Sequence, residues 1–407
     1  MTDAVIVAAT RSPIGRAGKG SLVDVRPDDL AATVVAAALA QVPGLDVSDL
    51  DDLMLGCAEP SHEQGTNLAR VVAVLLGHDG LPGTTVNRFC ASSVQTTRMA
   101  LHAIKAGEGH AFVSAGVECV SRYRGVSGSD LFGEAAMNPR FEGARRRTSE
   151  TARLNAPWQD PRGSGELPDM YIAMGQTAEN VATSRGVSRQ RQDEWAVRSQ
   201  NRAEAAIAAG HVEAEITQVT TPSGTVVSRD DGPRAGVTLE KVSALAPVFR
   251  EGGTVTAGNC CALNDGAAAL VVVSSDYAGA HCLTPLARVL STGVSALSPE
   301  IMGLGPVEAS RQALGRVGMT IADMDLVEIN EAFASQVLAS ADELGIDEDT
   351  LNVHGGAIAY GHPFGATGAR ITTTLLNALR VRDGQYGLET MCVGGGQGMA
   401  VVYERLG

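Results

Sequence analysis

The feature that most constrains the fold of this chain is an alternation of short β-rich runs and alanine-rich helical runs that occurs twice. Strands that alternate with helices are typical of layered α/β domains. The chain is therefore predicted to contain two copies of one α/β unit. The first copy has elements at 5–9, 30–41, 52–56, 92–106 and 111–115, and the second at 286–290, 306–317, 326–329, 365–379 and 389–393.

Two short sequence matches support the duplication. Asp49-Leu50-Asp51 precedes a predicted strand of the first copy, and Asp323-Met324-Asp325 precedes the corresponding strand of the second. Thr85-Val86-Asn87 similarly matches Thr350-Leu351-Asn352. Because short matches arise easily by chance, the shared order of elements is the stronger argument.

The two copies are separated by a segment, 122–253, that is richer in arginine, proline and polar residues. One helix is predicted at 190–209, with Ser188 as its N-cap and Gly210 just beyond its end. A connection of this length in a compact protein is usually a lid or a small subdomain. We therefore divide the chain into a first half at 1–121 and 254–283, an inserted loop domain at 122–253, and a second half at 284–407.

The charge pattern restricts the expected partners. The formal net charge is −14, whereas nucleic acids and anionic membranes select basic surfaces, so neither is expected to bind. The insertion nevertheless contains a basic stretch, with two interpretations: a solvated surface, or a rim that receives a polyanionic ligand such as a nucleotide phosphate. Its arginines are Arg140, Arg145, Arg146, Arg147, Arg153 and Arg162.

The seven cysteines show no CxxC spacing, which argues against a disulfide framework or a zinc knuckle. A zinc site built from the adjacent Cys260 and Cys261 with His281 would lack a fourth ligand, so no metal is expected. No apolar run approaches the roughly 18 residues that span a bilayer. Together these features indicate a reducing, cytoplasmic location.

Cys90 is the first candidate for chemistry, because it lies between a β-rich run and the helix predicted at 92–106. A thiol at a helix N-terminus faces unpaired N–H groups and the positive end of the helix dipole, and both lower its pKa. We therefore expect a nucleophile here, and the alternative is a small buried cysteine without a chemical role.

Three loops of the second copy carry further candidates. Cys392 is followed by the glycines at 394–396, whose backbone N–H groups can approach an oxyanion; no GK[ST] follows, so a phosphate loop is disfavoured. In Gly361-His362-Pro363 the neighbouring residues fix the loop and leave the imidazole free to act. Asn330 opens the stretch 330–334 at the end of a strand, where it would orient the histidine, hold a water, or cap a turn.

In their joint order these motifs resemble those of the thiolase family, from Val5 to Arg405. Supporting stretches lie at 115–118, 174–180, 253–259 and 264–266. The resemblance implies a thiolase fold: two βαβαβαββ halves in a layered α-β-α-β-α arrangement, with a loop domain inserted. It also implies an acyltransferase that cleaves a 3-oxoacyl-CoA with free CoA to give acetyl-CoA and a shortened acyl-CoA, or runs the reverse Claisen condensation.

The resemblance assigns roles to the candidates. Cys90 would carry the acyl group as a thioester, and His362 would take the Cys90 proton. Cys392 would protonate the acetyl-CoA enolate, or remove the α-proton in the synthetic direction. Asn330, through a water, and His362 would stabilise the enolate. The backbone N–H groups of Cys90 and Gly394 would stabilise the tetrahedral intermediate.

Substrate contacts are implied as well. Met174 and Phe333 would contact the acyl group, Arg234 the nucleotide of CoA, and Cys261 replaces the family's pantetheine-contacting serine. Ala173 stands where members that make acetoacetyl-CoA commonly have histidine, which favours a roomier acyl pocket. The resemblance implies CoA as co-substrate with no tightly bound cofactor, and a homodimer or homotetramer.

Two other functions remain to be weighed. β-Ketoacyl synthase-like condensing enzymes share the duplicated fold but pair the cysteine with two histidines, and the second position here is Asn330. A non-catalytic, CoA-binding thiolase-like partner subunit would usually have lost a catalytic residue. This chain keeps Cys90, Asn330, His362 and Cys392, so a thiolase is the predicted function.

Overall fold

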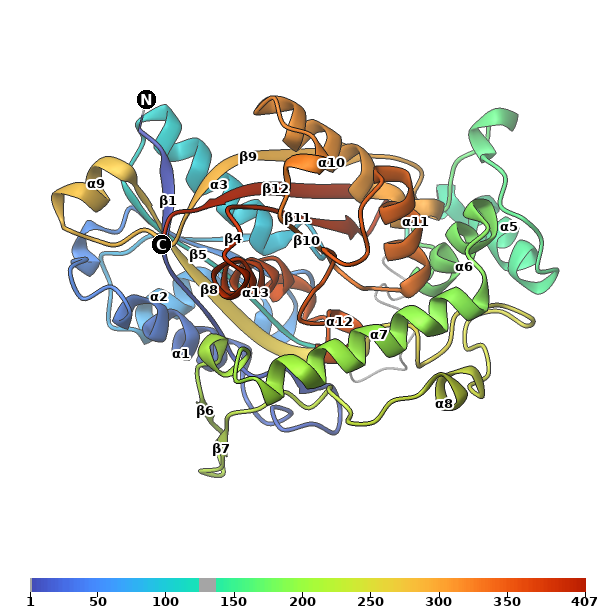
Figure 1. Cartoon of the computed structure of the whole chain (residues 1–407), viewed down its shortest axis with the longest axis horizontal. Coiled ribbons are helices and arrows are strands. Elements are labelled where there is room, and N and C mark those ends of the chain that lie inside the picture. The colour runs from blue at the N-terminus through green and yellow to red at the C-terminus, as the bar shows by residue number, and fades with distance from the viewer. Residues whose placement is uncertain (1, 124–136) are drawn as a thin grey trace.

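Two half-sheets meet at the strands β1 and β9 and form one sheet of ten strands (Figure 1). The computed structural model describes residues 2–123 and 137–407, so residues 124–136 of the predicted insertion lie outside the described residues. The halves are joined by only two antiparallel residue pairs, Val5 with Arg288 and Ile6 with Ala287. Each half therefore has a sheet of its own that touches the other at one edge.

The strand order is β4-β3-β5-β8-β1 in the first half and β9-β12-β11-β10 in the second, and β2 pairs with β8. The strands are β1 (Ala4–Arg11), β2 (Gly15–Arg16), β3 (Asp52–Gly56), β4 (Gly83–Val86), β5 (Ala111–Cys119), β8 (Asn264–Ser274), β9 (Ala287–Ala296), β10 (Leu326–Ile329), β11 (Tyr386–Val393) and β12 (Gln397–Arg405).

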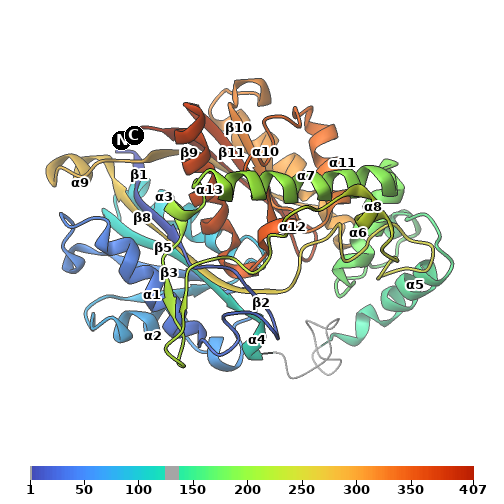
Figure 2. The ribbon, with the colours of Figure 1, turned by 60° about the horizontal axis from the view of Figure 1, so that its bottom comes forward.

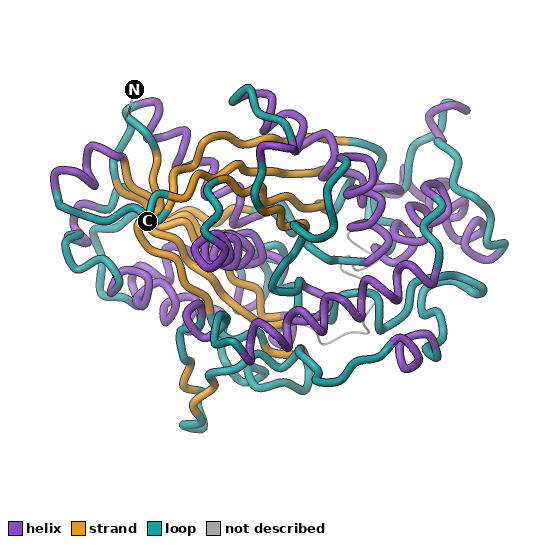
Figure 3. The backbone as a smooth tube through the Cα atoms, viewed as in Figure 1, coloured by secondary structure: helices purple, strands orange, loops and turns teal. Residues whose placement is uncertain are grey.

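Three layers of helices separate and cover the half-sheets (Figures 1 and 3). α1 (Pro27–Ala40) and α2 (Leu68–Leu75) cover the outer face of the first half, and α10 (Gly305–Arg316) and α11 (Ala334–Leu344) cover that of the second. Between the half-sheets lie α3 (Ser92–Ala106) and α13 (Thr367–Arg382). The order α-β-α-β-α predicted from the sequence is confirmed.

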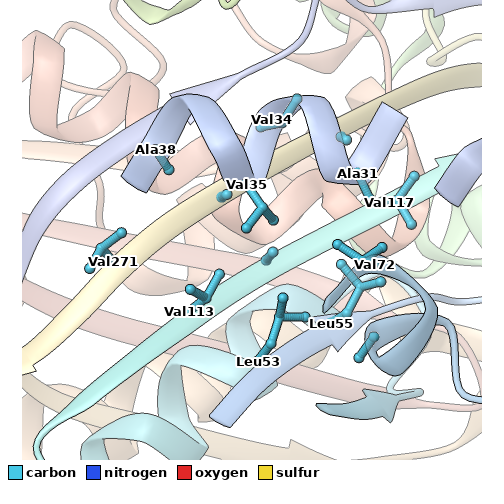
Figure 4. Close-up of a cluster of buried hydrophobic side chains, with 14 of the residues drawn as sticks. Ala31, Val34, Val35, Ala38, Leu53, Leu55, Val72, Val113, Val117 and Val271 are labelled. Carbon is cyan, nitrogen blue, oxygen red and sulfur yellow. The ribbon is translucent and has the colours of Figure 1, made fainter. Parts of the chain in front are cut away.

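Burial explains why these segments take their positions. All 11 residues of β8 are buried, as expected for a strand with helices on both faces. On the outer face, Val34 and Val35 of α1 pack toward Leu53, Leu55 and neighbouring valines of the sheet (Figure 4). In the central layer α13 is buried over most of its length, as a helix between two sheets must be.

The duplication holds at the level of single hydrogen bonds. Asp51 Oδ2 accepts from the N–H groups of His110 (2.6 Å) and Ala111 (3.0 Å), at the start of β5. Asp325 Oδ2 does the same for two N–H groups at the start of β11, at 2.7 and 2.8 Å. One element differs from the predicted βαβαβαββ order: the third strand of the second half is reduced to a single parallel bridge between Val327 and Leu351.

The segment between the halves packs on the second half along α7 (Figure 2) and on the first half through Val219 and Val227. Its elements are α4 (Val120–Tyr123), α5 (Glu142–Arg153), α6 (Met174–Arg185), α7 (Arg189–Ala208), β6 (Val219–Thr220), β7 (Val226–Val227) and α8 (Leu239–Ser243); α9 (Ser275–Ala280) and α12 (Ala357–Tyr360) lie beyond it. Ser188 caps α7 by accepting from Arg191 N–H at 3.2 Å, and Gly210 has a φ of +75°, so both predicted helix signals are confirmed. Among the described residues no helix is both long and apolar enough to cross a membrane.

The packing of β9 against α10 yields a stability prediction. A Cβ on Gly293 of β9 would overlap the carbonyl oxygen of Ala309, whereas a Cβ on Gly315, also near this contact, would meet nothing within 4 Å. Gly293→Ala should destabilise the protein by about 1–3 kcal/mol or more through overpacking. Gly315→Ala should stabilise it by up to about 1 kcal/mol, since alanine is the better helix former. Thermal unfolding should show Tm shifts of opposite sign, and an unchanged Tm for Gly293→Ala would contradict the close approach.

Candidate active site

The ends of two neighbouring parallel strands place Asn330 and Cys392 close together. β10 pairs with β11 up to Ile329 and Thr390, and Asn330 N–H donates to the Thr390 carbonyl at 3.0 Å. Cys392, two residues further along β11, is fully buried and packs in a cluster with Phe333. These residues come from the carboxyl edge of the second half-sheet.

His362 lies in the loop between α12 and α13 and is held on three sides. Its backbone N–H donates to Asn264 Oδ1 at 2.9 Å. Its Nε2 lies 3.3 Å from Asn330 Nδ2, and its Nδ1 lies 2.6 Å from Thr367 Oγ1. The imidazole is therefore fixed in the buried centre of the molecule, with the predicted Asn330 at one ring nitrogen and a residue that the sequence did not indicate, Thr367, at the other.

Cys90 lies in the tight turn that leads into α3. Phe89 has a φ of +45°, a left-handed conformation that is unusual outside glycine. The backbone N–H groups of Cys90 itself and of Gly394 are directed at the Cys90 sulfur. Arg88 Nη1 donates to Gln397 Oε1 at 2.9 Å and so ties this turn to the glycine loop after Cys392. The two predicted oxyanion donors thus converge beside the predicted nucleophile.

The first turns of α3 and α13 pack directly on each other. Ser93 Oγ accepts from Ala369 N–H at 3.0 Å, and a Cβ on Gly368 would overlap the backbone of Val94. Only glycine permits this close approach of the two helix starts. The Cys90 turn of the first half is thereby held against the His362 loop of the second.

Glu118, at the end of β5, is a buried carboxylate that joins the two halves. Its Oε2 accepts from Ala58 N–H at 2.8 Å and from Gly365 N–H, in the His362 loop, at 2.9 Å. Its Oε1 accepts from Gln64 Nε2 at 2.8 Å and Glu59 N–H at 3.2 Å. Burial raises the pKa of Glu118, and these hydrogen bonds oppose the rise. The stretch 115–118 supported the resemblance, but sequence gave no role for this carboxyl.

Glu331 has a similar role on the side of the insertion. Its two oxygens accept from Trp195 Nε1 (3.1 Å) and Asn352 Nδ2 (2.9 Å), and from Ser199 Oγ (2.6 Å) and Ile358 N–H (3.0 Å). The carboxylate that follows Asn330 therefore binds α7 to the second half. Because it accepts four hydrogen bonds, its role is structural rather than proton transfer.

Burial sets the charge state of the reactive groups. Desolvation raises the pKa of the Cys90 thiol to about 12, although the N–H groups of Gly394 and Cys90 act in the opposite direction. It also raises the pKa of Cys392 well above its usual value and, with nearby Arg370, lowers that of His362 to about 3. The predicted lowering of the Cys90 pKa is therefore wrong, because desolvation outweighs the helix N-terminus. All three shifts favour the neutral forms of the two thiols and the imidazole.

The predicted acyl-side residues gather next to Cys392. Met174 and Cys260 pack against the cluster that contains Phe333 and Cys392. Cys260 forms an antiparallel bridge with Phe333, and Cys261 N–H donates to the Ala332 carbonyl at 3.1 Å. A Cβ on Gly395 would come within 2.7 Å of Met170 Cε. Met170 is thus a further side chain at the glycine loop, which is more than 220 residues away in sequence.

A pocket of about 310 Å³ lies next to the His362 loop and is lined by its Gly361. Its lining includes Arg234, the predicted contact of the CoA nucleotide, and also Arg16 and Lys241, for which the sequence offered no signal. Its inner part is lined by Cys260, the buried Asn264 that binds the His362 backbone, and Gly361.

The six arginines of the basic stretch do not line this pocket. Arg147 instead pairs with Glu300 at 3.0 Å, and Arg146 is exposed beside Glu142. Of the two interpretations of that stretch, the structure favours the solvated surface.

Within residues 2–123 and 137–407, no three or more His, Cys, Asp or Glu side chains are arranged to hold a metal ion.

A duplicated, five-layered α/β fold thus brings two cysteines, a histidine and an asparagine from the two halves together at its centre. Two family models match the chain: "Thiolase, N-terminal domain" over residues 4–276 and "Thiolase, C-terminal domain" over residues 283–405. The chain belongs to the thiolase family, and its predicted fold class and acyltransferase class are confirmed.

Full-length relatives agree. The chain is 40% identical to the 3-ketoacyl-CoA thiolase of Bacillus subtilis, over 99% of this chain and 100% of the relative. It is 43% identical to the beta-ketoadipyl-CoA thiolase of Pseudomonas aeruginosa, over 99% of each. The solved structure of human mitochondrial 3-ketoacyl-CoA thiolase in complex with CoA matches with a TM-score of 0.85 at 34% identity, covering 100% of this chain and 98% of that one. The synthase-like and non-catalytic alternatives are not favoured.

The bonds of Glu118 yield a prediction. Glu118→Ala removes the acceptor of four donors, three of them in buried contacts, and each buried donor left unpaired costs about 1–3 kcal/mol. We expect a large fall in Tm and, where the protein still folds, a fall in kcat, because the His362 loop loses its hold on the first half. Glu108→Ala, at an exposed position after α3, is the control. Unfolding curves and thiolysis rates check both, and equal behaviour of the two variants would contradict this role of Glu118.

Proposed function

We propose that the protein is a thiolase that cleaves 3-oxoacyl-CoA with CoA through an acyl-Cys90 intermediate. The observation that carries this proposal is the convergence of the Cys90 and Gly394 N–H groups on the Cys90 sulfur, with Cys392 beside it. Attack by the sulfur on the 3-oxo carbon would place the carbonyl oxygen near these same donors. Because such donors stabilise an oxyanion more than a neutral carbonyl, they lower the barrier to the tetrahedral intermediate.

The protons on Cys90, His362 and Cys392 can be followed through two half-reactions. A neutral His362 takes the Cys90 proton as the sulfur attacks, which avoids the cost of a permanent buried thiolate. The bond between C2 and C3 of the substrate then breaks, the acyl group stays on Cys90, and Cys392 donates its proton to C2 of the leaving acetyl-CoA enolate. In the second half-reaction the CoA thiol gives its proton to the Cys392 thiolate and displaces the acyl group, and the departing Cys90 thiolate takes its proton back from His362.

Asn330 and His362 are proposed to stabilise the enolate. Asn330 is 1% exposed, and its Oδ1 has no hydrogen-bond partner within the described part of the chain. This acceptor suits a water that donates one hydrogen to Asn330 and the other to an enolate oxygen. The Asn330–His362 contact of 3.3 Å supports a shared binding point for that oxygen.

The pocket is proposed as the CoA site, with Arg16, Arg234 and Lys241 toward the phosphates. Three cations around one pocket of an acidic protein favour an anionic ligand. CoA enters as co-substrate, and we propose that no other cofactor is held tightly. The pantetheine arm would then run past Cys260 and Cys261 toward Cys90. A CoA complex of a relative supports this use of the fold.

The acyl chain is proposed to be longer than that of acetoacetyl-CoA. Ala173, at the N-cap of α6, offers no bulk beside Met174, and Met170 and Met174 have flexible side chains that adapt to different chains. The names of the relatives, which act on 3-ketoacyl-CoA and beta-ketoadipyl-CoA, point the same way.

The proposal also covers the organisation of the protein. The first half is proposed to comprise residues 1–121 and 254–283, and the second half residues 284–407. The insertion at 122–253 is proposed to be the CoA-binding unit. A homodimer or homotetramer follows from the family resemblance. A cytoplasmic location is supported by seven free cysteines.

The decisive experiment follows the loss of 3-oxoacyl-CoA absorbance on addition of CoA, over acetoacetyl, medium-chain, 3-oxoadipyl and ring-bearing substrates. Cys90→Ala should lower kcat at least about 10³-fold, and Cys282→Ala, at an exposed thiol, should leave it unchanged. Persistent cleavage by Cys90→Ala would remove Cys90 as nucleophile. Absence of cleavage by the folded wild type would favour the partner subunit, and a clear preference for acetoacetyl-CoA would overturn the longer-chain proposal.

The pocket assignment yields its own prediction. Arg234→Ala removes a cation from the pocket rim, so KM for CoA should rise about tenfold while kcat at saturating CoA changes little. Arg146→Ala removes an exposed arginine outside the pocket and should leave KM within about twofold. Steady-state kinetics with varied CoA separate the two, and an equal effect of both variants would contradict the assignment.

A further inference from the structure

Thr367 occupies a position that the proposed chemistry does not yet use. It is the first residue of α13, is completely buried, and does not line the CoA pocket. Its Oγ1 lies 2.6 Å from His362 Nδ1 and 3.0 Å from the carbonyl oxygen of Pro363. One hydroxyl thus contacts both the imidazole and the backbone of the same loop.

The hydrogen of this hydroxyl can serve only one of the two contacts. The Pro363 carbonyl has no hydrogen, so its contact requires the Thr367 O–H to donate to it. The lone pairs of Oγ1 then face His362 Nδ1, and a short contact of this kind is a hydrogen bond only if Nδ1 carries the hydrogen. The neutral imidazole is therefore protonated on Nδ1, and Nε2 has a free lone pair.

The opposite side of the ring selects the same tautomer. Asn330 Nδ2 lies 3.3 Å from Nε2, and an amide NH₂ group only donates. In an Nε2–H tautomer, the Nε2–H group and the Asn330 NH₂ group would both be donors at this contact. Neither would find an acceptor in the other. In this orientation of the amide, which leaves Asn330 Oδ1 for the proposed water, the Asn330 contact selects the same Nδ1–H form as the Thr367 contact.

We propose that Thr367 is the positioning residue that keeps His362 protonated on Nδ1, so that Nε2 is the atom that accepts the Cys90 proton. This rests on the proposed function. When Nε2 takes the proton, the ring becomes an imidazolium. Its hydrogen bond at Nδ1 is kept, because the Nδ1–H still donates to Thr367. That hydrogen bond becomes charge-assisted and stronger at the step where the buried ring becomes charged. No atom other than this one proton changes place.

The first measurement reads the tautomer directly and does not depend on activity. In full-length wild-type protein with ¹⁵N-labelled histidine, long-range ¹H–¹⁵N spectra should show His362 with a protonated Nδ1 and an unprotonated Nε2 at neutral pH. A His362→Gln variant identifies the resonances. An Nε2-protonated ring in the wild type would overturn the proposal, whatever the kinetics show.

The second measurement uses matched variants of α13. Thr367→Val keeps the shape but removes the acceptor, and should lower kcat for thiolysis about 10²-fold while KM for CoA stays within about threefold. Thr367→Ser restores the hydroxyl and should recover kcat to within about threefold of the wild type. Thr373→Val is the control, because Thr373 is also buried on α13 and also donates to the carbonyl four residues earlier, at 2.8 Å, but has no contact with His362.

The outcomes separate this inference from the proposed function. An inactive wild type contradicts the function alone, since the tautomer is read without turnover. An active wild type in which Thr367→Val keeps its kcat within threefold, or in which Thr367→Ser is as impaired as Thr367→Val, contradicts the role of Thr367. A similar loss in Thr373→Val would also contradict it, because the effect would then come from the helix.

Discussion

The site depends on the buried carboxylate of Glu118, which accepts hydrogen bonds from both halves of the chain. The loop after β3 and the loop that carries His362 have no covalent link near each other, since Glu118 and Gly365 are 247 residues apart in sequence. Each backbone N–H that Glu118 binds would cost about 1–3 kcal/mol if it were left unpaired in the interior. The first half therefore cannot move away from the His362 loop without exposing or orphaning these donors. The Ser93–Ala369 contact between α3 and α13 adds a second tie at the same place.

The same burial that fixes the loops decides how the site handles charge. Desolvation disfavours the charged forms of Cys90, Cys392 and His362 alike. A permanent thiolate–imidazolium pair would have to overcome that cost in every resting molecule. A neutral site carries no such cost before substrate arrives, and in the proposed mechanism the N–H groups of Cys90 and Gly394 would stabilise the charge where it develops. The helix N-terminus at Cys90 thus acts through fixed donors rather than through a lowered resting pKa.

The sequence predicted the regular elements well where a strong periodic pattern ends at a clear signal. The bounds of β3, α3 and β10 agree with the predicted 52–56, 92–106 and 326–329, and Ser188 with Gly210 delimited α7 to within one residue. Prediction failed where the deciding contact is distant in sequence. Thr367 and Glu118 look ordinary until the fold brings His362 and Gly365 to them. The Cys90 pKa was misjudged for the same reason, because a local helix signal does not reveal how much protein covers the thiol.

The duplication explains why the chemistry lies where it does. In both halves the amino ends of the strands remain alike, because Asp51 and Asp325 bind the starts of β5 and β11 in the same way. The carboxyl ends have diverged: β3 is followed by Cys57, and β10 by Asn330. Two identical halves would bring two identical groups to the centre, whereas acyl transfer needs a nucleophile and a base of different kinds. Since the two central helices begin next to each other, the loops before α3 and α13 bring Cys90 of one half and His362 of the other to the same part of the molecule.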